Sequence, residues 1–142
     1  MARDRVYTSS QYREVVDGLK KNDVLGLNIV EGKDIFMLAV ALGLDNPTQL
    51  KNKIGLFLNT ALKTADKALM ASVLLGTVTD DSQLDEYADQ DLSADLCEQC
   101  AESGYQLLLK KYNDADCDPD LMERRMIKEL ELLFIKNVEA DI

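Results

Sequence analysis

The chain has 142 residues, of which 46% are hydrophobic and 30% are charged, and its formal net charge is −10. This length allows one domain with its own core, and the acidic excess argues against a general binder of the nucleic-acid backbone. The sequence contains no histidine, which excludes catalytic systems that use histidine as the general base. Helix-favouring residues dominate, so we predict an all-α fold: a single-domain helical bundle of about five to six helices over residues 1–142.

The first residues and the cysteine count indicate where the protein resides. Residues 1–5 lead into a polar segment, whereas a signal peptide would continue with an apolar run. The longest uncharged apolar runs, 35–44 and 68–79, are shorter than the ~20 residues that cross a bilayer. Three cysteines without a secretory signal fit a reducing compartment. We therefore expect a cytoplasmic protein that makes no membrane contact.

The first predicted helix covers residues 9–21. Thr8 and Gln11 have the spacing of a capping box, and apolar residues recur at helical spacing after them. Residues 24–31 tolerate an extended backbone, and we interpret them as a short connection or a lone strand.

The most apolar segment of the chain is residues 32–44. It is apolar on all sides, so we predict a central helix that the other helices surround. Gly43 fits a left-handed C-terminal cap for this helix. Residues 51–62 are ambiguous, being either a short helix or a loop that buries Phe57. A further helix is predicted over residues 65–77.

The C-terminal half is predicted to hold a short helix over residues 83–88 and a long one over about residues 91–112. Gly104 in the long helix would permit close contact with another helix. Asp118 and Pro119 suit the N-cap and first position of the last helix. A broad apolar stripe follows in that helix: Leu121, Ile127, Leu130, Leu133, Phe134 and Val138. A symmetric homodimer would cover apolar sides that this helix or residues 32–44 leave exposed.

The charges divide the chain into two unlike parts. Residues 1–78 carry ten basic and eight acidic side chains, whereas residues 79–142 carry six and eighteen. The candidate nucleic-acid contacts are Lys51, Lys53, Lys63 and Lys67. The candidate partner-binding acidic face is Asp80, Asp81, Asp85, Glu86 and Asp89. In both cases the alternative is an ordinary solvated surface.

Three patterns resemble chemical sites, but each is incomplete. Cys97 and Cys100 have metal-ligand spacing without a second pair of ligands, so we interpret them as small core residues. The loop that begins at Asp114 has Pro119 where a calcium loop requires glycine. The acidic cluster near residue 80 could serve metal-dependent phosphoryl transfer only if its carboxylates converged in a cleft. We therefore predict no catalytic residues, metal or cofactor, with a metal-dependent activity of the acidic residues as the alternative.

Several blocks of the sequence match a known family. Lys33-Asp34-Ile35-Phe36 and Ala41-Leu42-Gly43 are followed by Ile54-Gly55-Leu56-Phe57, Asp66-Lys67-Ala68-Leu69-Met70 and Tyr105-Gln106-Leu107-Leu108. In these blocks the chain resembles the small proteins of DNA phosphorothioation (Dnd) gene clusters, the Dnd system-associated protein 4 family. Residues 45–50 depart from the family, which has a Gly/Arg-rich piece and Pro-Leu in that region. The resemblance implies a place in an anti-phage defence or DNA-modification locus, without a known catalytic residue.

Three functional hypotheses follow. The first is a non-enzymatic accessory protein of a defence system that binds other proteins of its locus. The second is a DNA-associated regulator that uses the four lysines as a phosphate-facing patch. The third is an inhibitor whose acidic half mimics nucleic acid.

Overall fold

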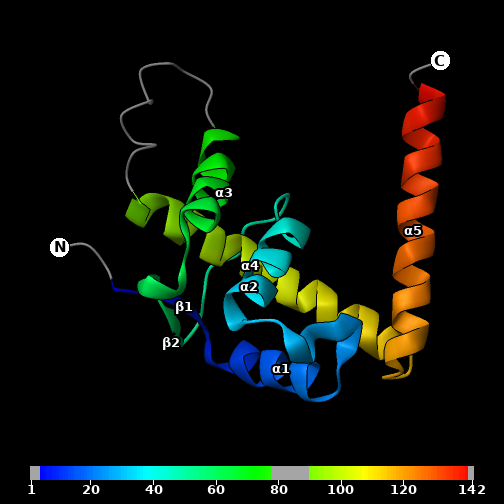
Figure 1. The fold of residues 1–142 in the computed structure, drawn as a ribbon, viewed down its shortest axis with the longest axis horizontal. Coiled ribbons are helices and arrows are strands. Elements are labelled where there is room, and N and C mark those ends of the chain that lie inside the picture. Colours follow the sequence, from blue (N-terminus) through cyan, green and yellow to red (C-terminus); the bar gives the residue numbers. More distant parts are fainter. Residues whose placement is uncertain (1–3, 78–89, 141–142) are drawn as a thin grey trace.

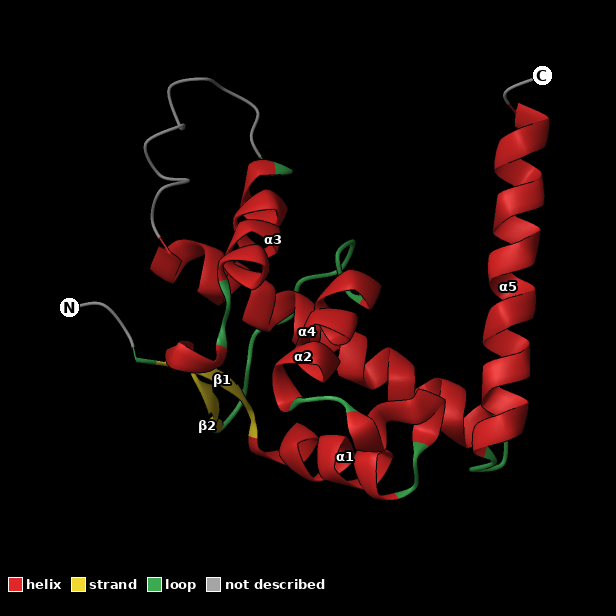
Figure 2. Cartoon of the chain, viewed as in Figure 1, coloured by secondary structure: helices red, strands yellow, loops and turns green. Residues whose placement is uncertain are grey.

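The computed structural model describes residues 4–77 and 90–140, and most of them are helical (Figures 1 and 2). In chain order the elements are β1 (Arg5–Ser9), α1 (Ser10–Lys21), the 3-10 helix η1 (Val24–Ile29), α2 (Gly32–Leu42), β2 (Lys53–Leu58), the 3-10 helix η2 (Asn59–Ala61), α3 (Thr64–Leu75), α4 (Gln90–Asp114) and α5 (Pro119–Ala140). The prediction of a mainly helical fold is confirmed. The helix predicted over residues 83–88 lies outside the described residues.

A small sheet accompanies the helices. β1 and β2 pair antiparallel, with Val6 opposite Phe57 and a bulge after Val6 (Figure 2). Both interpretations of residues 51–62, a helix or a loop, are therefore wrong for the segment that forms β2. Its strand partner lies more than forty residues earlier in the chain, so local periodicity does not reveal the pairing. Phe57 is half-buried and packs edge-on against Phe36 of α2, with ring centroids 5.5 Å apart.

α1 begins one residue later than predicted, and the capping box is absent. The N-cap of the helix is Ser9, whose side chain makes no capping hydrogen bond. The Ser9 hydroxyl instead lies 2.7 Å and 2.8 Å from the two carboxylate oxygens of Glu102 on α4, to which it donates. Thr8 belongs to β1. The Ser9 side chain is therefore bound to α4 and does not cap α1.

The segment after α1 is the 3-10 helix η1, so the interpretation as an extended strand is wrong. Asp23, Leu25 and Gly26 have positive φ angles of 51°, 56° and 72°. These left-handed residues curl the chain tightly, and Val24 and Leu27 enter the core as a result. α5 later packs against η1.

α4 occupies the centre of the fold. It contacts α1, α2, α3, α5 and β1, and crosses the middle of the molecule in Figure 1. The helix predicted to be central, α2, lies against α4 along one side, where Ile35, Phe36, Ala39 and Val40 are buried. The other sides of α2 are only partly covered, because Met37 and Leu38 are half-buried and Ala41 is exposed.

Two glycines allow α2 and α4 to approach closely. A Cβ atom on Gly104 of α4 would collide with the backbone carbonyl of Ala39, so the predicted close helix contact at this glycine is confirmed. A Cβ atom on Gly43 would collide with the carbonyl of Cys100. The predicted left-handed cap at Gly43 is wrong, because its φ is −102° and its ψ is 11°. The position requires glycine for space and not for backbone conformation.

Carboxylates mark the starts of three helices. Asp34 and Asp66 accept hydrogen bonds from the N–H groups of Glu31 and Lys63, at 3.2 Å and 2.8 Å. Asp118 Oδ1 accepts one from the N–H of Asp120 at 3.0 Å, which confirms the predicted N-cap of α5. Each negative charge lies at the positive end of a helix dipole, where it is stabilising.

Candidate interaction surfaces

The four candidate lysines form two pairs. Lys51 and Lys53 lie just before and at the start of β2, whereas Lys63 and Lys67 lie at the start of α3. β2 separates the pairs along the chain, and a six-residue strand is about 16 Å long at roughly 3.3 Å per residue. All four side chains are exposed. The four lysines therefore come from two separate places in the fold, the start of β2 and the start of α3.

The start of α3 already holds a negative group of this chain. Asp66 Oδ2 accepts from the N–H of Lys63 and lies 2.7 Å from Nζ of Lys33, a residue of α2 that is 7% exposed. The hydrogen bond from Lys33 lowers the pKa of Asp66 and raises the pKa of Lys33. A phosphate at this helix start would have to compete with Asp66.

The acidic candidates Asp80, Asp81, Asp85, Glu86 and Asp89 lie outside the described residues. Within residues 4–77 and 90–140, no three cysteine or acidic side chains are grouped so that they could hold a metal ion. Asp114, Asp116, Asp118 and Asp120 are exposed around the turn from α4 to α5. Asp118 in this set serves as the N-cap of α5.

The cysteines of α4 belong to the core. Cys97 and Cys100 are 0% and 1% exposed, and Sγ of Cys97 lies 3.7 Å from the carbonyl oxygen of Met70 on α3. Burial raises the pKa of Cys97 to about 12 and also raises the pKa of Cys100. Both groups are therefore protonated thiols at neutral pH, which disfavours nucleophilic or ligand chemistry. Cys117, in the turn before α5, is exposed.

Two buried carboxylates that the sequence analysis did not single out hold β1 against α4. Glu98 and Glu102 are 2% and 3% exposed. The N–H of Tyr7 donates to Oε2 of Glu98 at 2.6 Å, next to the β-bulge. Ser9, which donates to Glu102, also accepts from the N–H of Lys51 at 2.8 Å. These contacts hold β1 against α4 and join the residues just before β2 to Ser9.

Burial raises the pKa of Glu102, while its hydrogen bonds with Ser9 and the charge of Lys51 oppose that rise. The sequence did contain a signal for these two carboxylates. Glu98 and Glu102 are four residues apart and so lie on one side of α4. The same side carries the small residues Ala94, Cys97 and Ala101. Carboxylates on an apolar helix face need hydrogen-bond donors from another element. β1 provides those donors, and the sequence alone does not identify it as the source.

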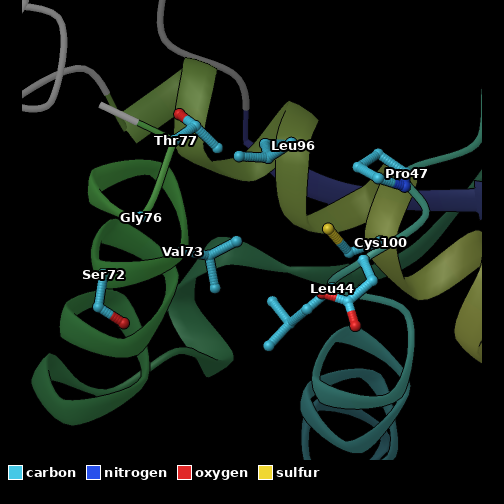
Figure 3. A pocket seen from close by; sticks show the side chains of 9 residues that line it. Leu44, Pro47, Ser72, Val73, Gly76, Thr77, Leu96 and Cys100 are labelled. Carbon is cyan, nitrogen blue, oxygen red and sulfur yellow. The ribbon is translucent and has the colours of Figure 1, made fainter. Parts of the chain in front are cut away.

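A shallow cleft lies between α3, α4 and the loop after α2 (Figure 3). Its volume is about 330 Å³, and the described residues that line it are Leu44, Asp45, Pro47, Ser72, Val73, Gly76, Thr77, Leu96 and Cys100. Figure 3 shows Leu44, Val73 and Leu96 around its mouth and the Cys100 thiol beside them. These residues do not form a set of converging acid, base and nucleophile, so the cleft has the character of a packing defect with a small apolar opening.

More than half of the large apolar side chains that are exposed in the described residues lie on the last helix. α5 joins the body at its first turns, where Met122 is buried and Glu129 pairs with Lys111 at 2.6 Å. Beyond these turns the helix stands away from the other helices (Figure 1). The large apolar side chains exposed on it are Ile127, Leu130, Leu132, Leu133, Phe134, Ile135 and Val138. The predicted apolar stripe of this helix is therefore present but lies mostly outside the core.

Comparisons with known proteins found no matching family model, curated protein or solved structure. None of the helices in the described residues combines the length and the apolar character that a membrane span requires.

Proposed function

We propose that this protein is a non-enzymatic accessory protein that acts through protein–protein contacts. The observation that carries the proposal is the exposed apolar surface of α5. Phe134 and Leu130 are 71% and 65% exposed on a helix of 22 residues. Contiguous apolar surface of this kind is typical of sites that bind another protein.

The placement of the ionisable and nucleophilic groups supports this proposal. Cys97 and Cys100 pack in the core, and Glu98 and Glu102 accept hydrogen bonds from β1. Of these four residues only Cys100 lines the cleft of Figure 3, and it is 1% exposed. The acidic bias of the chain, with a net charge of −10, would favour a basic partner protein by electrostatic steering.

The identity of the partner is proposed from the family resemblance. Lys33-Asp34-Ile35-Phe36 and Ala41-Leu42-Gly43, which carry the resemblance, form most of α2 and its end. We propose that the partners are proteins of a phosphorothioation-linked or other anti-phage defence locus in the cytoplasm.

The test is expression of the full chain with its neighbouring genes, followed by purification with and without nuclease at low and high salt. A complex with a neighbouring gene product that resists nuclease would support an accessory subunit. Recovery of chaperones alone would contradict it. Leu130→Glu on α5 should weaken such a complex if α5 forms the contact. Gly18→Ala on α1, where an added Cβ atom has open space, serves as a control.

The same purification tests the two other hypotheses. DNA that co-purifies at low salt, is lost at high salt and is lost on charge reversal of Lys51, Lys53, Lys63 and Lys67 would establish a DNA-associated regulator. Competition between this chain and DNA for one partner would establish nucleic-acid mimicry by the acidic half.

A further inference from the structure

The exposed apolar side chains of α5 are concentrated on one side of the helix. At 100° per residue, five of them fall within an arc of about 140°. We call these residues the α5 face: Ile127, Leu130, Leu133, Phe134 and Val138, which are 48%, 65%, 55%, 71% and 45% exposed. No other described element covers this face.

We propose that the α5 face binds the α5 face of a second copy of this chain, and that the two helices pair antiparallel in a symmetric dimer. The proposal rests on the proposed function in taking α5 as an interaction surface. It goes further by naming the occupant of that surface and its orientation.

The apolar area of the α5 face is large enough for a dimer interface. Phe presents roughly 150–250 Å² when fully exposed and the aliphatic residues somewhat less, so at 45–71% exposure the α5 face offers on the order of 500 Å² of surface per copy. A stable interface buries about 800 Å² per partner, and about 65% of that area is apolar in homodimers. The α5 face alone therefore provides the apolar core of a standard dimer interface.

The distribution of charge also favours contact between two α5 helices. α5 carries four basic and five acidic side chains, so nine of the ten net negative charges lie elsewhere in the chain. Two copies of nearly neutral α5 can meet without strong repulsion, and the flanking lysines and arginines of one can face the glutamates of the other. The remainder of each copy is strongly acidic, which disfavours contact between the two bodies.

The charges also select the orientation. α5 joins its body at the N-terminal end, so a parallel pair would place two acidic bodies side by side (Figure 1). An antiparallel pair places them at opposite ends of the joined helices. Repulsion between the bodies therefore favours the antiparallel arrangement.

The test compares two leucines on opposite sides of α5. Leu130 and Leu132 are 65% and 58% exposed and lie about 200° apart around the helix axis. The natural chain should sediment at twice the monomer mass at micromolar concentration. Leu130→Glu should raise the dimer dissociation constant about 100-fold or more, because the charge would enter the interface twice. Leu132→Glu should change it less than about 3-fold.

Both leucines are exposed in the monomer, so circular dichroism should show the same helix content in both variants. Phe134→Glu provides a second disruption of the same face. A natural chain that stays monomeric at all concentrations would overturn the inference. So would a dimer that survives Leu130→Glu and Phe134→Glu, or one that only Leu132→Glu dissociates.

The orientation has its own measurement. Cys117 is exposed just before α5, while Cys97 and Cys100 are buried, so a spin label added to the folded protein should attach at Cys117. An antiparallel pair centred on the α5 face separates the two labels by about 45 Å at 1.5 Å per residue. A parallel pair places them roughly 10–20 Å apart, near the interaxial distance of packed helices. A short distance would overturn the antiparallel arrangement.

The outcomes separate this inference from the proposed function. A monomeric chain that still binds a protein of its locus, and loses it on Leu130→Glu, would leave the proposed function standing and remove the dimer. A stable dimer that co-purifies with no other protein would support the dimer and contradict the proposed function.

Discussion

The contact between α2 and α4 and the exposed part of α5 are both rich in large apolar residues, but only the first is buried. Phe36 of α2 is 0% exposed, whereas Phe134 of α5 is 71% exposed. The difference lies in how closely the backbones of neighbouring helices can approach each other. Gly43 and Gly104 let α2 and α4 approach until backbone carbonyls occupy the space of the missing Cβ atoms. α5 is held by its first turns alone, so apolar composition by itself does not predict burial.

The largest effect is expected at the glycine between the two central helices. Gly104→Ala should lower the free energy of unfolding by about 3 kcal/mol or more, because its Cβ would overlap the carbonyl of Ala39 and the helices would have to separate. Gly18→Ala on α1, where a Cβ has open space, should stabilise the protein by about 0.5–1 kcal/mol. Urea denaturation measures both. Equal effects at the two glycines would show that the close approach is not required.

A second experiment compares leucines of the two regions. Leu108 of α4 is 0% exposed, and Leu108→Ala should cost about 3 kcal/mol by leaving a cavity. Leu132→Ala on the far side of α5 should change the free energy of unfolding by less than about 0.5 kcal/mol. Urea denaturation of the two variants should give well-separated midpoints. A large loss for Leu132→Ala would indicate that this side of α5 is buried in solution.

The smallest effect concerns pH and the carboxylate that binds Ser9. Burial raises the pKa of Glu102 above its ordinary value near 4.5, so the folded state holds this proton more tightly than the unfolded state. The stabilisation from protonated Glu102 is complete at pH values below the ordinary pKa. It is lost as the pH rises through the pKa of the folded state. The natural chain should therefore gain stability relative to Glu102→Gln as pH falls from neutral to about 4.5.

Denaturation midpoints across this pH range provide the measurement. Glu123→Gln on the exposed side of α5 controls for the loss of one charge. The pKa of Asp66 is lowered from 3.8, so it lies below this pH range. The ion pair between Asp66 and Lys33 therefore stays charged throughout the experiment. Parallel pH curves for the natural chain and Glu102→Gln would contradict the assignment.

The helices were the most predictable part of the fold, since each depends on signals within a short stretch. Apolar periodicity placed α1 within one residue of its start, and Asp118 with Pro119 correctly marked the start of α5. Gly104 was predicted to allow helix contact because glycine in a helix interior otherwise costs stability. The β1–β2 pairing was missed because its two strands lie far apart in sequence.

The interaction surfaces were predictable only in part. The apolar stripe of the last helix could be read from the sequence. Its exposure could not, because it depends on the direction that α5 takes after the turn before Pro119. The four lysines are close in sequence, and the structure places one pair at the start of β2 and the other at the start of α3. Thr8, the predicted cap of the first helix, lies in β1, and the Ser9 hydroxyl at the observed N-cap binds Glu102, a residue 93 positions away.

The sequence by itself determined the helical class, most helix positions and the acidic character, because composition, periodicity and capping are local properties. Only the tertiary structure decided that Glu98 and Glu102 hold β1 and that the α5 face lies outside the core. Each of these depends on which distant backbone approaches a given side chain. That approach is set by the packing of whole helices, which no single segment encodes.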